Sequence, residues 1–524
     1  MQKLPIGIQT FSDIQTGNYC YADKTRLIAQ LIDHGKFYFL SRPRRFGKSL
    51  LIDTIADAFL GNKKLFKGLY IEKHWDWDKK HPVIRIDFAE SLLNSATRLN
   101  EKLLHQIEDC AAHYKIQLRR TDPSDQFHEL IRKLHEKTGQ RVAVLIDEYD
   151  KPILDNITTP DIAKKQRDGL RNFYSVLKAQ GAHLCFVMLT GVSKFSKVSL
   201  FSGLNNLQDI TLDKRYGTIC GYTEKELETV FHEYLDNVDI DQVKKWYNGY
   251  NFLSEPVYNP FDVLLYLDTH QFKSHWFETG TPTFLVDLIH EKKLLTTSLE
   301  NLEITDTFMG SFDVDSIEPE PLLFQTGYLT ILKEETYPGG IFYTLGFPNH
   351  EVRYAFNNAI LLKLSNSGQN QDRHKLALMR ILQNNKLDKL KDLFHSFFAS
   401  IPNEWYRKND IAQYESYYCS IVYCYFTALG LEVHAEESTN HGQLDMAVLF
   451  NNCVYIIEFK VNELTKPGKA LAQIKQKKYH EKYADQETYI IGIEFSKNEK
   501  NITRFEWEKI KNSQLKTIHS PTPS

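Results

Sequence analysis

The sequence predicts the α/β fold class, with a parallel, doubly wound sheet near the N-terminus and a second α/β domain at the C-terminus. In the N-terminal third, short apolar runs alternate with helix-length amphipathic stretches, which is typical of β-α-β units. Near the C-terminus, two apolar-rich runs flank an Asn-Asn pair, a pattern that predicts a β-hairpin. The pattern of residues 216–395 is mostly helical and predicts a lid and connector region.

Composition and charge narrow the class of protein. The chain has 524 residues and a formal net charge of −3, which excludes a globally basic histone-like binder and an acidic tail protein. Its seven cysteines are odd in number and include no C-x-x-C pair, which argues against a disulfide framework and a zinc site. Because no signal peptide or membrane-length apolar run is seen, we expect a soluble, cytoplasmic protein without a membrane partner.

Four apolar runs in the N-terminal third predict the strands of the parallel sheet. Three of them are almost continuously apolar, as expected for strands that are covered on both faces. Helix-length segments at 50–60, 93–113 and 161–180 lie between or after them. The predicted strands are Phe37–Leu40, Val83–Phe88, Val142–Ile146 and Leu184–Thr190.

The loop after the first predicted strand carries the end of a phosphate-binding pattern. It reads Ser41-Arg-Pro-Arg-Arg-Phe-Gly-Lys-Ser49, whereas the full pattern is G-x-x-x-x-G-K-[ST]. Gly47 would let backbone N–H groups approach a phosphate, Lys48 would reach the β- and γ-phosphates, and Ser49 would bind Mg²⁺. Arg42 stands where the first Gly is expected, so an Arg-Pro turn must bend the chain. We expect nucleotide contacts from Arg45, Phe46, Gly47, Lys48 and Ser49.

Two carboxylates directly follow the predicted strand 142–146. In nucleotide-hydrolysing folds, Asp147 would hold Mg²⁺ through water and Glu148 would polarise the attacking water. The alternative is that Asp147 is the N-cap of a following helix. The ATPase interpretation is favoured because both patterns occur in order, on strands that we expect to be neighbours.

The end of the fourth predicted strand offers a sensor of the γ-phosphate. Ligands gather outside the carboxyl ends of parallel strands, and Thr190, Ser193 and Lys194 follow or end this strand. The sequence does not choose among the three, and an ordinary polar loop fits equally well. We place Thr190 among the nucleotide-binding residues.

These N-terminal segments resemble the bacterial predicted AAA-ATPase-like family, a relative of archaeal STAND-type P-loop ATPases. The resemblance rests on Tyr21–Thr25, the loop at 42–49, Leu145–Pro152 and Leu189–Phe195, and it places the ATPase core at residues 1–215. The usual loop of the family also begins with Arg-Pro, so Arg42 does not imply lost binding. The resemblance implies ATP and Mg²⁺ as cofactors, and homo-oligomers, because such ATPases often borrow an Arg from a neighbour.

The middle region, residues 216–395, offers structural signals. Thr223 and Glu226 have the spacing of a capping box and predict the first helix of a lid. Residues 322–329 and 340–345 predict a helix and a small sheet, for which a winged-helix module is one interpretation. Residues 364–393 predict a helical connector.

The predicted C-terminal hairpin brings acidic residues together. If Asn451 and Asn452 form its loop, Asp445 lies across from Glu458, and Lys460 projects from the same face. Opposed carboxylates repel one another unless a cation lies between them, and Mg²⁺ prefers carboxylate oxygens. The pattern favours a metal-dependent phosphodiester hydrolysis site, with Asp445 and Glu458 as metal ligands and Lys460 orienting water. The alternative is a solvated hairpin whose charges pair with Lys460.

The flanking segments add further candidates. Glu415 begins an aromatic-rich helix and would bring another carboxylate to the metal, although helix solubility explains it equally well. A helix predicted from Pro467 to Tyr479 lies within residues 464–482, which hold six Lys and one Glu and suit contact with phosphates. The nucleic-acid contacts that we expect are Gln473, Lys475, Lys477 and Lys478.

This C-terminal region resembles the PD-(D/E)XK nuclease superfamily, whose fold is restriction-endonuclease-like. The resemblance spans roughly residues 400–515, and the domain is placed at 396–524. Its acidic, lysine and glutamine positions fall on Glu415, Asp445, Glu458, Lys460 and Gln473. It implies Mg²⁺-dependent cleavage of nucleic acid, DNA rather than RNA, in mobile-element or defence processes of a bacterium. Two alternatives stay open: a nucleotide-gated switch whose nuclease fold binds without cleaving, and an RNA-directed nuclease.

Overall fold

The computed structural model of the chain divides into two compact units. The first comprises Met1–Thr281 and Leu302–Asn349, and the second comprises Pro282–Asn301 and His350–Ser524. Phe195, which ends one of the segments quoted above, and the C-terminal tail lie outside the described residues. The structure describes all residues except 90–92, 195–199, 202–203, 205, 277–284, 287, 290–291, 293, 311–313, 316, 366–367, 402–414, 440–441 and 511–524.

A five-stranded parallel sheet forms the centre of the first unit, in the order β2-β3-β4-β1-β5. The four predicted strands are confirmed. Our expectation that the strand before the phosphate loop neighbours the strand before Asp147 is wrong, because β4 pairs with both β1 and β3 and separates them. The strands are β1 (Phe37–Ser41), β2 (Val83–Asp87), β3 (Val142–Asp147), β4 (Leu184–Gly191) and β5 (Gln208–Asp209).

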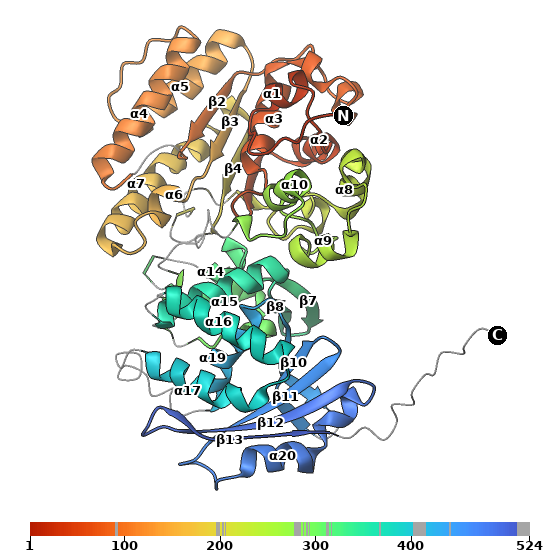
Figure 1. Cartoon of the computed structure of the whole chain (residues 1–524). Coiled ribbons are helices and arrows are strands. Elements are labelled where there is room, and N and C mark those ends of the chain that lie inside the picture. Colours follow the sequence, from red (N-terminus) through yellow and green to blue (C-terminus); the bar gives the residue numbers. More distant parts are fainter. Residues whose placement is uncertain are drawn as a thin grey trace, which may run out of the picture. The chain divides into compact units, whose positions relative to one another are not determined.

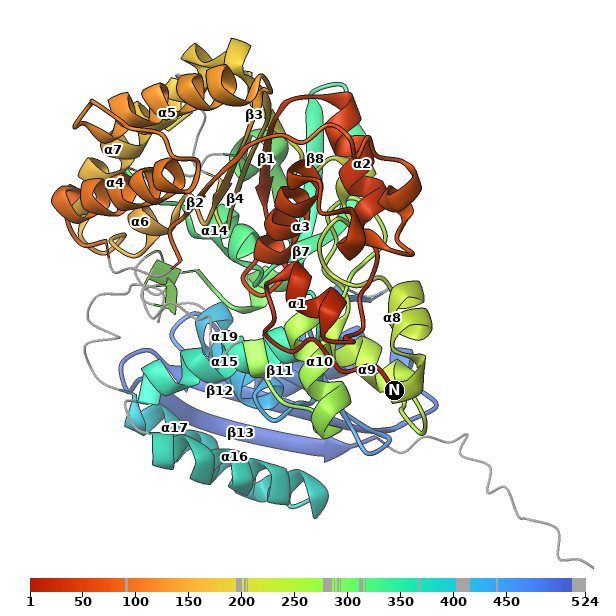
Figure 2. The same cartoon turned by 90° about the horizontal axis from the view of Figure 1, so that it is seen from above.

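Helices cover both faces of this sheet, which confirms the doubly wound fold (Figures 1 and 2). On one side lie α4, α5 and α7, and on the other lie α1, α2 and α3. In α4, Leu99, Leu103 and Ile107 are buried at helical spacing. The helices are α1 (Phe11–Thr16), α2 (Thr25–His34), α3 (Lys48–Leu60), α4 (Ala96–His113), α5 (Pro123–Thr138), α6 (Lys151–Leu154) and α7 (Pro160–Ala179).

The predicted capping box is present at the start of the region that we expect to form a lid. The Thr223 hydroxyl accepts a hydrogen bond from the backbone N–H of Glu226, and the Glu226 carboxylate accepts one from the N–H of Thr223. This satisfies two N–H groups that would otherwise lack partners at the helix start. The helices of this region are α8 (Glu224–Val230), α9 (Ile240–Tyr247) and α10 (Pro260–Thr269).

The predicted helix and small sheet of the middle region are also confirmed. The sheet is antiparallel, with the strand order β6-β8-β7. In the chain, α14 lies between β6 and β7. These elements belong to the first unit. Their bounds are β6 (Leu302–Thr305), α13 (Asp306–Met309), α14 (Pro319–Thr326), β7 (Thr330–Tyr337) and β8 (Gly340–Gly346).

The second unit contains a mixed sheet in the order β13-β12-β11-β10-β9. The pair β11 and β12 is parallel, and the other neighbouring pairs are antiparallel. Strand β11 is buried along almost its whole length because helices cover both of its faces. The strands are β9 (Glu432–Thr439), β10 (Gly442–Phe450), β11 (Cys453–Val461), β12 (Glu487–Ser496) and β13 (Asn501–Lys509).

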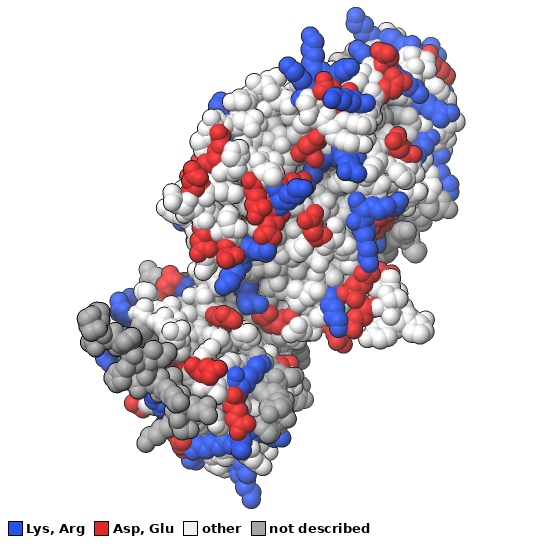
Figure 3. All heavy atoms as spheres, turned by 90° about the vertical axis from the view of Figure 1, so that its right-hand side faces the viewer, with Lys and Arg blue, Asp and Glu red and all other residues white. Residues whose placement is uncertain are grey.

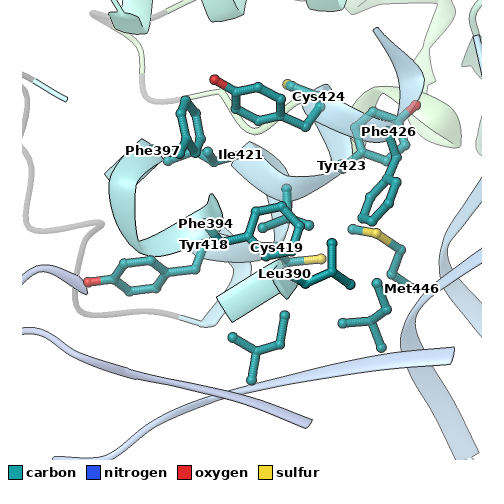
Figure 4. Close-up of a cluster of buried hydrophobic side chains, with 14 of the residues drawn as sticks. Leu390, Phe394, Phe397, Tyr418, Cys419, Ile421, Tyr423, Cys424, Phe426 and Met446 are labelled. Atoms are coloured by element: carbon teal, nitrogen blue, oxygen red, sulfur yellow. The ribbon is translucent and has the colours of Figure 1, made fainter. Parts of the chain in front are cut away.

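One face of the mixed sheet packs on an aromatic-rich helical layer. In it, Phe394 and Phe397 of α17 lie against Tyr418 and Ile421 of α19 (Figure 4). Much of the segment expected as a connector, 364–393, is therefore part of this core. The opposite face is covered by α20. The helices are α15 (His350–Ser365), α16 (Gly368–Gln383), α17 (Leu390–Ser400), α19 (Glu415–Thr427) and α20 (Lys469–Lys477).

The surface carries both signs of charge. On the face drawn in Figure 3, Lys and Arg side chains are interspersed with Asp and Glu side chains, in line with the near-neutral net charge. Among the described helices, none combines the length and the apolar character needed to cross a membrane.

Candidate nucleotide and nuclease sites

The phosphate loop joins β1 to α3 and is shaped around Gly47 and Lys48. Gly47 adopts a φ of 87°, a left-handed conformation that favours glycine. The ammonium group of Lys48 donates to the carbonyl oxygens of Arg42 and Pro43, at 3.0 Å each. Burial lowers the pKa of Lys48, and the nearby Asp147 and Glu148 oppose this shift. A phosphate would offer this buried ammonium group an anionic partner.

The carboxyl end of β3 places Asp147 beside β4. The hydroxyl of Thr190 donates to Asp147 Oδ1 at 2.6 Å, and both side chains are buried. Thr190 therefore orients Asp147, and its hydroxyl proton is committed to that carboxylate. The other two sensor candidates also have protein partners, since Ser193 donates to Asp150 and Lys194 pairs with Asp209 at 2.6 Å.

Glu148 has the position and environment expected of a residue that polarises water. It adopts a φ of 51°, which costs a non-glycine residue about 1–2 kcal/mol. Burial raises the pKa of Glu148, Lys48 opposes the shift, and Asp147 and Asp150 add to it. A carboxylate with a raised pKa is a better proton acceptor near neutral pH.

A pocket of about 550 Å³ extends from the phosphate loop, a volume within the usual range for small-molecule sites. Its polar end is lined by Lys48, Ser49 and Glu148. Its apolar lining includes Ile8 from the N-terminal segment and Phe261 from α10. Arg45, Phe46 and Gly47 also line the pocket, whereas Asp147 and Thr190 are not among its lining residues. The pocket therefore combines a polar end at the phosphate loop with a partly apolar lining.

Asp150 is a residue of this site that our sequence analysis left without a role. It is buried, and Oδ2 accepts hydrogen bonds from the N–H and the hydroxyl of Ser193, both at 2.6 Å, and from the N–H of Val192 at 3.1 Å. It therefore fixes the loop after β4. The sequence offered one signal for it: Asp150 is a further carboxylate, three residues after Asp147.

The C-terminal hairpin has the predicted register. Phe450 pairs with Cys453, and the pairing continues to Met446 and Ile457. The two loop residues adopt the positive φ values that a tight turn requires, 49° for Asn451 and 60° for Asn452. Asp445 precedes Met446 on β10, and its carboxylate accepts a hydrogen bond at 2.8 Å from the backbone N–H of Phe459. The Asp445 carboxylate is thus held at the β11 segment that carries Glu458 and Lys460.

Lys460 lies among the carboxylates of this centre. Its ammonium group is 3.0 Å from Glu415 Oε2 and 3.1 Å from Glu458 Oε1. Burial alone would lower the pKa of Lys460, but Glu458, Asp445 and Glu415 raise it to about 12. Glu415, from the start of α19, is therefore linked through Lys460 to the hairpin carboxylate Glu458.

The ionised forms of the two hairpin carboxylates, Asp445 and Glu458, are disfavoured by their surroundings. Burial raises the pKa of both Asp445 and Glu458, and the mutual repulsion of the two groups raises that of Glu458 further. Glu458 Oε2 is buried and has no hydrogen-bond partner among the described residues. An orphaned carboxylate oxygen in such a place fits a hard cation. The described part of the chain holds no group of three or more His, Cys, Asp or Glu side chains already arranged to bind a metal ion. At this centre, Lys460 lies between Glu415 and Glu458.

Helix α20 contributes Gln473, whose carboxamide nitrogen donates to Glu458 Oε1. Lys477 packs beside Gly442 of β10 and has no partner among the described residues. The other two lysines on which we expected nucleic-acid contacts are paired with glutamates: Lys475 with Glu508 and Lys478 with Glu481. Gln473 and Lys477 thus lie beside residues of the hairpin, Glu458 and Gly442.

Gly492 of β12 allows the close approach of α20 to the sheet, and no pattern in the sequence indicated this role. A Cβ at this position would lie 2.5 Å from the backbone nitrogen of Leu471, much closer than atoms in contact tolerate. Because Gly492 pairs with Glu458 in register, the close approach brings Gln473 within reach of Glu458. A contact between residues so far apart in sequence leaves no local pattern.

The chain joins two known kinds of domain. Residues 5–201 match a family model described as "Predicted AAA-ATPase", and residues 413–507 match one described as "PD-(D/E)XK nuclease superfamily". Both resemblances in the sequence are confirmed, and with them an ATPase-like domain followed by a nuclease-superfamily domain.

A relative from Azotobacter chroococcum mcd 1 matches this chain over almost its whole length. It bears the name "Uncharacterized protein in vnfD 5'region" and is 49% identical over 512 residues, which are 97% of this chain and 99% of the relative. The chain belongs to the family of this protein.

Proposed function

We propose that the protein binds and hydrolyses ATP and is a Mg²⁺-dependent nuclease that cuts DNA in preference to RNA. The charge of the C-terminal centre carries the proposal. Three carboxylates surround one ammonium group there, which leaves a formal charge of −2 when all are ionised. A divalent cation balances that charge, and the unpartnered oxygen of Glu458 supplies a ligand for it.

Each residue of the nuclease centre then has a distinct role. Asp445 and Glu458 would hold the cation, with Glu415 as a further ligand, and a bound Mg²⁺ would stabilise negative charge on a phosphate. Lys460 would orient the attacking water, Gln473 would fix Glu458, and Lys477 would contact the nucleic-acid backbone. At the other site, Lys48 would bind the phosphates of ATP, Ser49 and Asp147 would hold Mg²⁺, and Glu148 would polarise water.

A second function is favoured by one observation. Lys460 itself occupies the position between Glu415 and Glu458, so it neutralises part of the charge that would attract a metal. A centre of this kind suits a nucleotide-gated switch whose nuclease fold binds nucleic acid without cutting it.

Digestion assays with the full-length protein separate these functions. Single-stranded DNA, duplex DNA and RNA would be incubated with and without Mg²⁺ and ATP, and ATP hydrolysis would be measured in the same samples. Our proposal predicts Mg²⁺-dependent cleavage of DNA together with phosphate release. ATP hydrolysis without cleavage of any substrate would favour the switch, and preferential cleavage of RNA would correct the substrate class. Cleavage without ATP hydrolysis would contradict the ATPase half.

A further inference from the structure

Arg42, which stands at the first glycine position of the phosphate-loop pattern, is fully buried. Its Nη1 donates to the carbonyl oxygens of Ser41 and Thr211, at 2.8 and 2.9 Å. Its Nη2 donates to those of Tyr216 and Gly217, at 3.2 and 3.3 Å. No described carboxylate forms an ion pair with it, so backbone carbonyls alone accept its hydrogen bonds.

An aromatic ring completes the environment of this guanidinium group. The ring centroid of Phe252 lies 3.8 Å from Arg42 Cζ, close enough for a cation–π interaction. Phe46, four residues along the phosphate loop, contacts the rings of Phe252 and Tyr250 edge-on. Two side chains of the loop are therefore anchored in the aromatic segment 250–252.

The main chain of Arg42 faces the nucleotide side of the loop. Its carbonyl oxygen accepts a hydrogen bond from the ammonium group of Lys48 at 3.0 Å. One residue thus connects Lys48, through its backbone, to the segment 211–217 and to Phe252, through its side chain. All of these distant partners lie beyond residues 5–201, the part of the chain that matches the ATPase family.

The backbone at this position does not itself require an arginine or a glycine. Arg42 is not among the residues with positive φ, whereas Arg45 and Gly47, which shape the turn, are. The buried guanidinium is also costly, since burial lowers the pKa of Arg42 to about 10. A buried charge held by four carbonyls and a ring is therefore maintained for its contacts rather than for the shape of the turn.

We propose that Arg42 is a positioning residue of the nucleotide site, which locks the phosphate loop to the segments 211–217 and 250–252 and so holds Lys48 in its binding position. This inference rests on the proposed ATPase function, because it explains how the same site is shaped. The segments that shape the nucleotide site would then include 211–217, which precedes α8, and 250–252, which lies between α9 and α10.

The test replaces Arg42 with the residue that the standard pattern contains. MgATP affinity would be measured by calorimetry for the full-length parent and for Arg42→Gly, Arg42→Lys and Phe252→Leu, with Arg132→Ala as control. Arg132 is exposed and pairs with Glu136 on its own helix. Hydrogen exchange of 211–217 would be followed in the nucleotide-free proteins.

We expect Arg42→Gly to weaken MgATP binding at least tenfold and to speed exchange at 211–217, although it restores the consensus glycine. Arg42→Lys, which keeps the charge but lacks the planar fork, would fall between that variant and the parent, and Phe252→Leu would weaken binding several-fold. If Arg42→Gly does not fold, the lysine and leucine variants decide the question in the same way. The inference would be overturned if Arg42→Gly bound MgATP as tightly as the parent. If Arg42→Gly does not fold, parent-like affinity of both Arg42→Lys and Phe252→Leu would overturn it. Unchanged hydrogen exchange at 211–217 would overturn it as well. If the parent itself binds no ATP, the proposed function fails, and the exchange data alone decide whether Arg42 locks the loop.

Discussion

The ammonium group of Lys460 lies 3.1 Å from the carboxylate of Glu458, two residues earlier on the same strand. Residues two apart on a strand project from one face, and here that face is buried under α20. Lys460 therefore supplies a fixed positive charge next to a carboxylate that water does not reach. This pair links the electrostatics of the centre to its proposed chemistry, and most of the predictions below depend on it.

The raised pKa values of the carboxylates predict that Mg²⁺ binds more tightly as the pH rises. Burial raises the pKa of Asp445 to about 6 and that of Glu458 to about 8. Over the pH range in which they titrate, these two carboxyl groups therefore bind more protons in the folded, metal-free protein than in the unfolded chain. Their contribution to the free energy of unfolding accordingly falls as the pH increases. A cation must displace those protons, so its affinity should rise up to about tenfold per pH unit for each proton displaced.

Calorimetric titration with Mg²⁺ between about pH 6 and about pH 8 checks this. Two buffers with different ionisation enthalpies would count the protons released. Glu458→Gln, which has no proton to lose, should weaken binding and flatten the dependence. An affinity that does not change with pH in the parent would contradict the assignment of Asp445 and Glu458 as metal ligands.

Lys460→Met should separate catalysis from metal binding. Without the ammonium group, the attacking water is not oriented, and we expect cleavage to fall at least about 100-fold. Mg²⁺ affinity should stay the same or increase, because the charge that competes with the cation is gone. Initial cleavage rates and Mg²⁺ titrations would be compared with those of Lys391→Met, an exposed lysine of the same unit. Normal cleavage by Lys460→Met would exclude a catalytic role.

Glu148→Gln should stop ATP turnover while sparing ATP binding. The amide keeps the shape of the side chain but cannot accept a proton, so we expect phosphate release to fall at least about 100-fold. MgATP affinity should change by less than about threefold, because Lys48 and the loop are intact. Glu136→Gln, on the exposed surface of α5, is the matched control. Hydrolysis at the rate of the parent would show that another group polarises the water.

Gly492→Ala should impair the nuclease centre by displacing α20, which covers both Gly492 and its register partner Glu458. The added Cβ meets the Leu471 backbone, and the helix must move outward, which takes Gln473 away from Glu458. We expect slower cleavage and a melting temperature a few degrees lower, since overpacking a core costs about 1–3 kcal/mol. Gly339→Ala is the control, because no atom lies within 4 Å of a Cβ there. Full activity of Gly492→Ala would mean that the contact between Gln473 and Glu458 is dispensable.

The parts of the structure that the sequence predicted are those with local causes. The turn at Asn451 and Asn452 follows from residues that tolerate positive φ, and strand alternation then carries the register back toward Asp445. The helix start at Thr223 likewise depends on residues three apart. In each case the pattern and the contact that it predicts lie within one hairpin or one helical turn.

What the sequence did not predict depends on how distant segments meet. The order of β1, β4 and β3 is set by the crossover connections and leaves no trace in the strands themselves. Thr190 was expected to face a phosphate, but its hydroxyl donates to Asp147 on the neighbouring strand. The partners of Arg42 lie about 170 positions further along the chain, and no spacing rule connects them.

The most direct test of the central claim, that one chain carries two separate phosphate-cleaving centres, is to follow ATP hydrolysis and DNA cleavage together in Asp445→Asn. We predict that this variant loses at least about 99% of Mg²⁺-dependent cleavage, as expected for loss of a metal ligand, while it hydrolyses ATP at the rate of the parent and of the exposed control Asp485→Asn. Cleavage by Asp445→Asn at the rate of the parent would contradict the account.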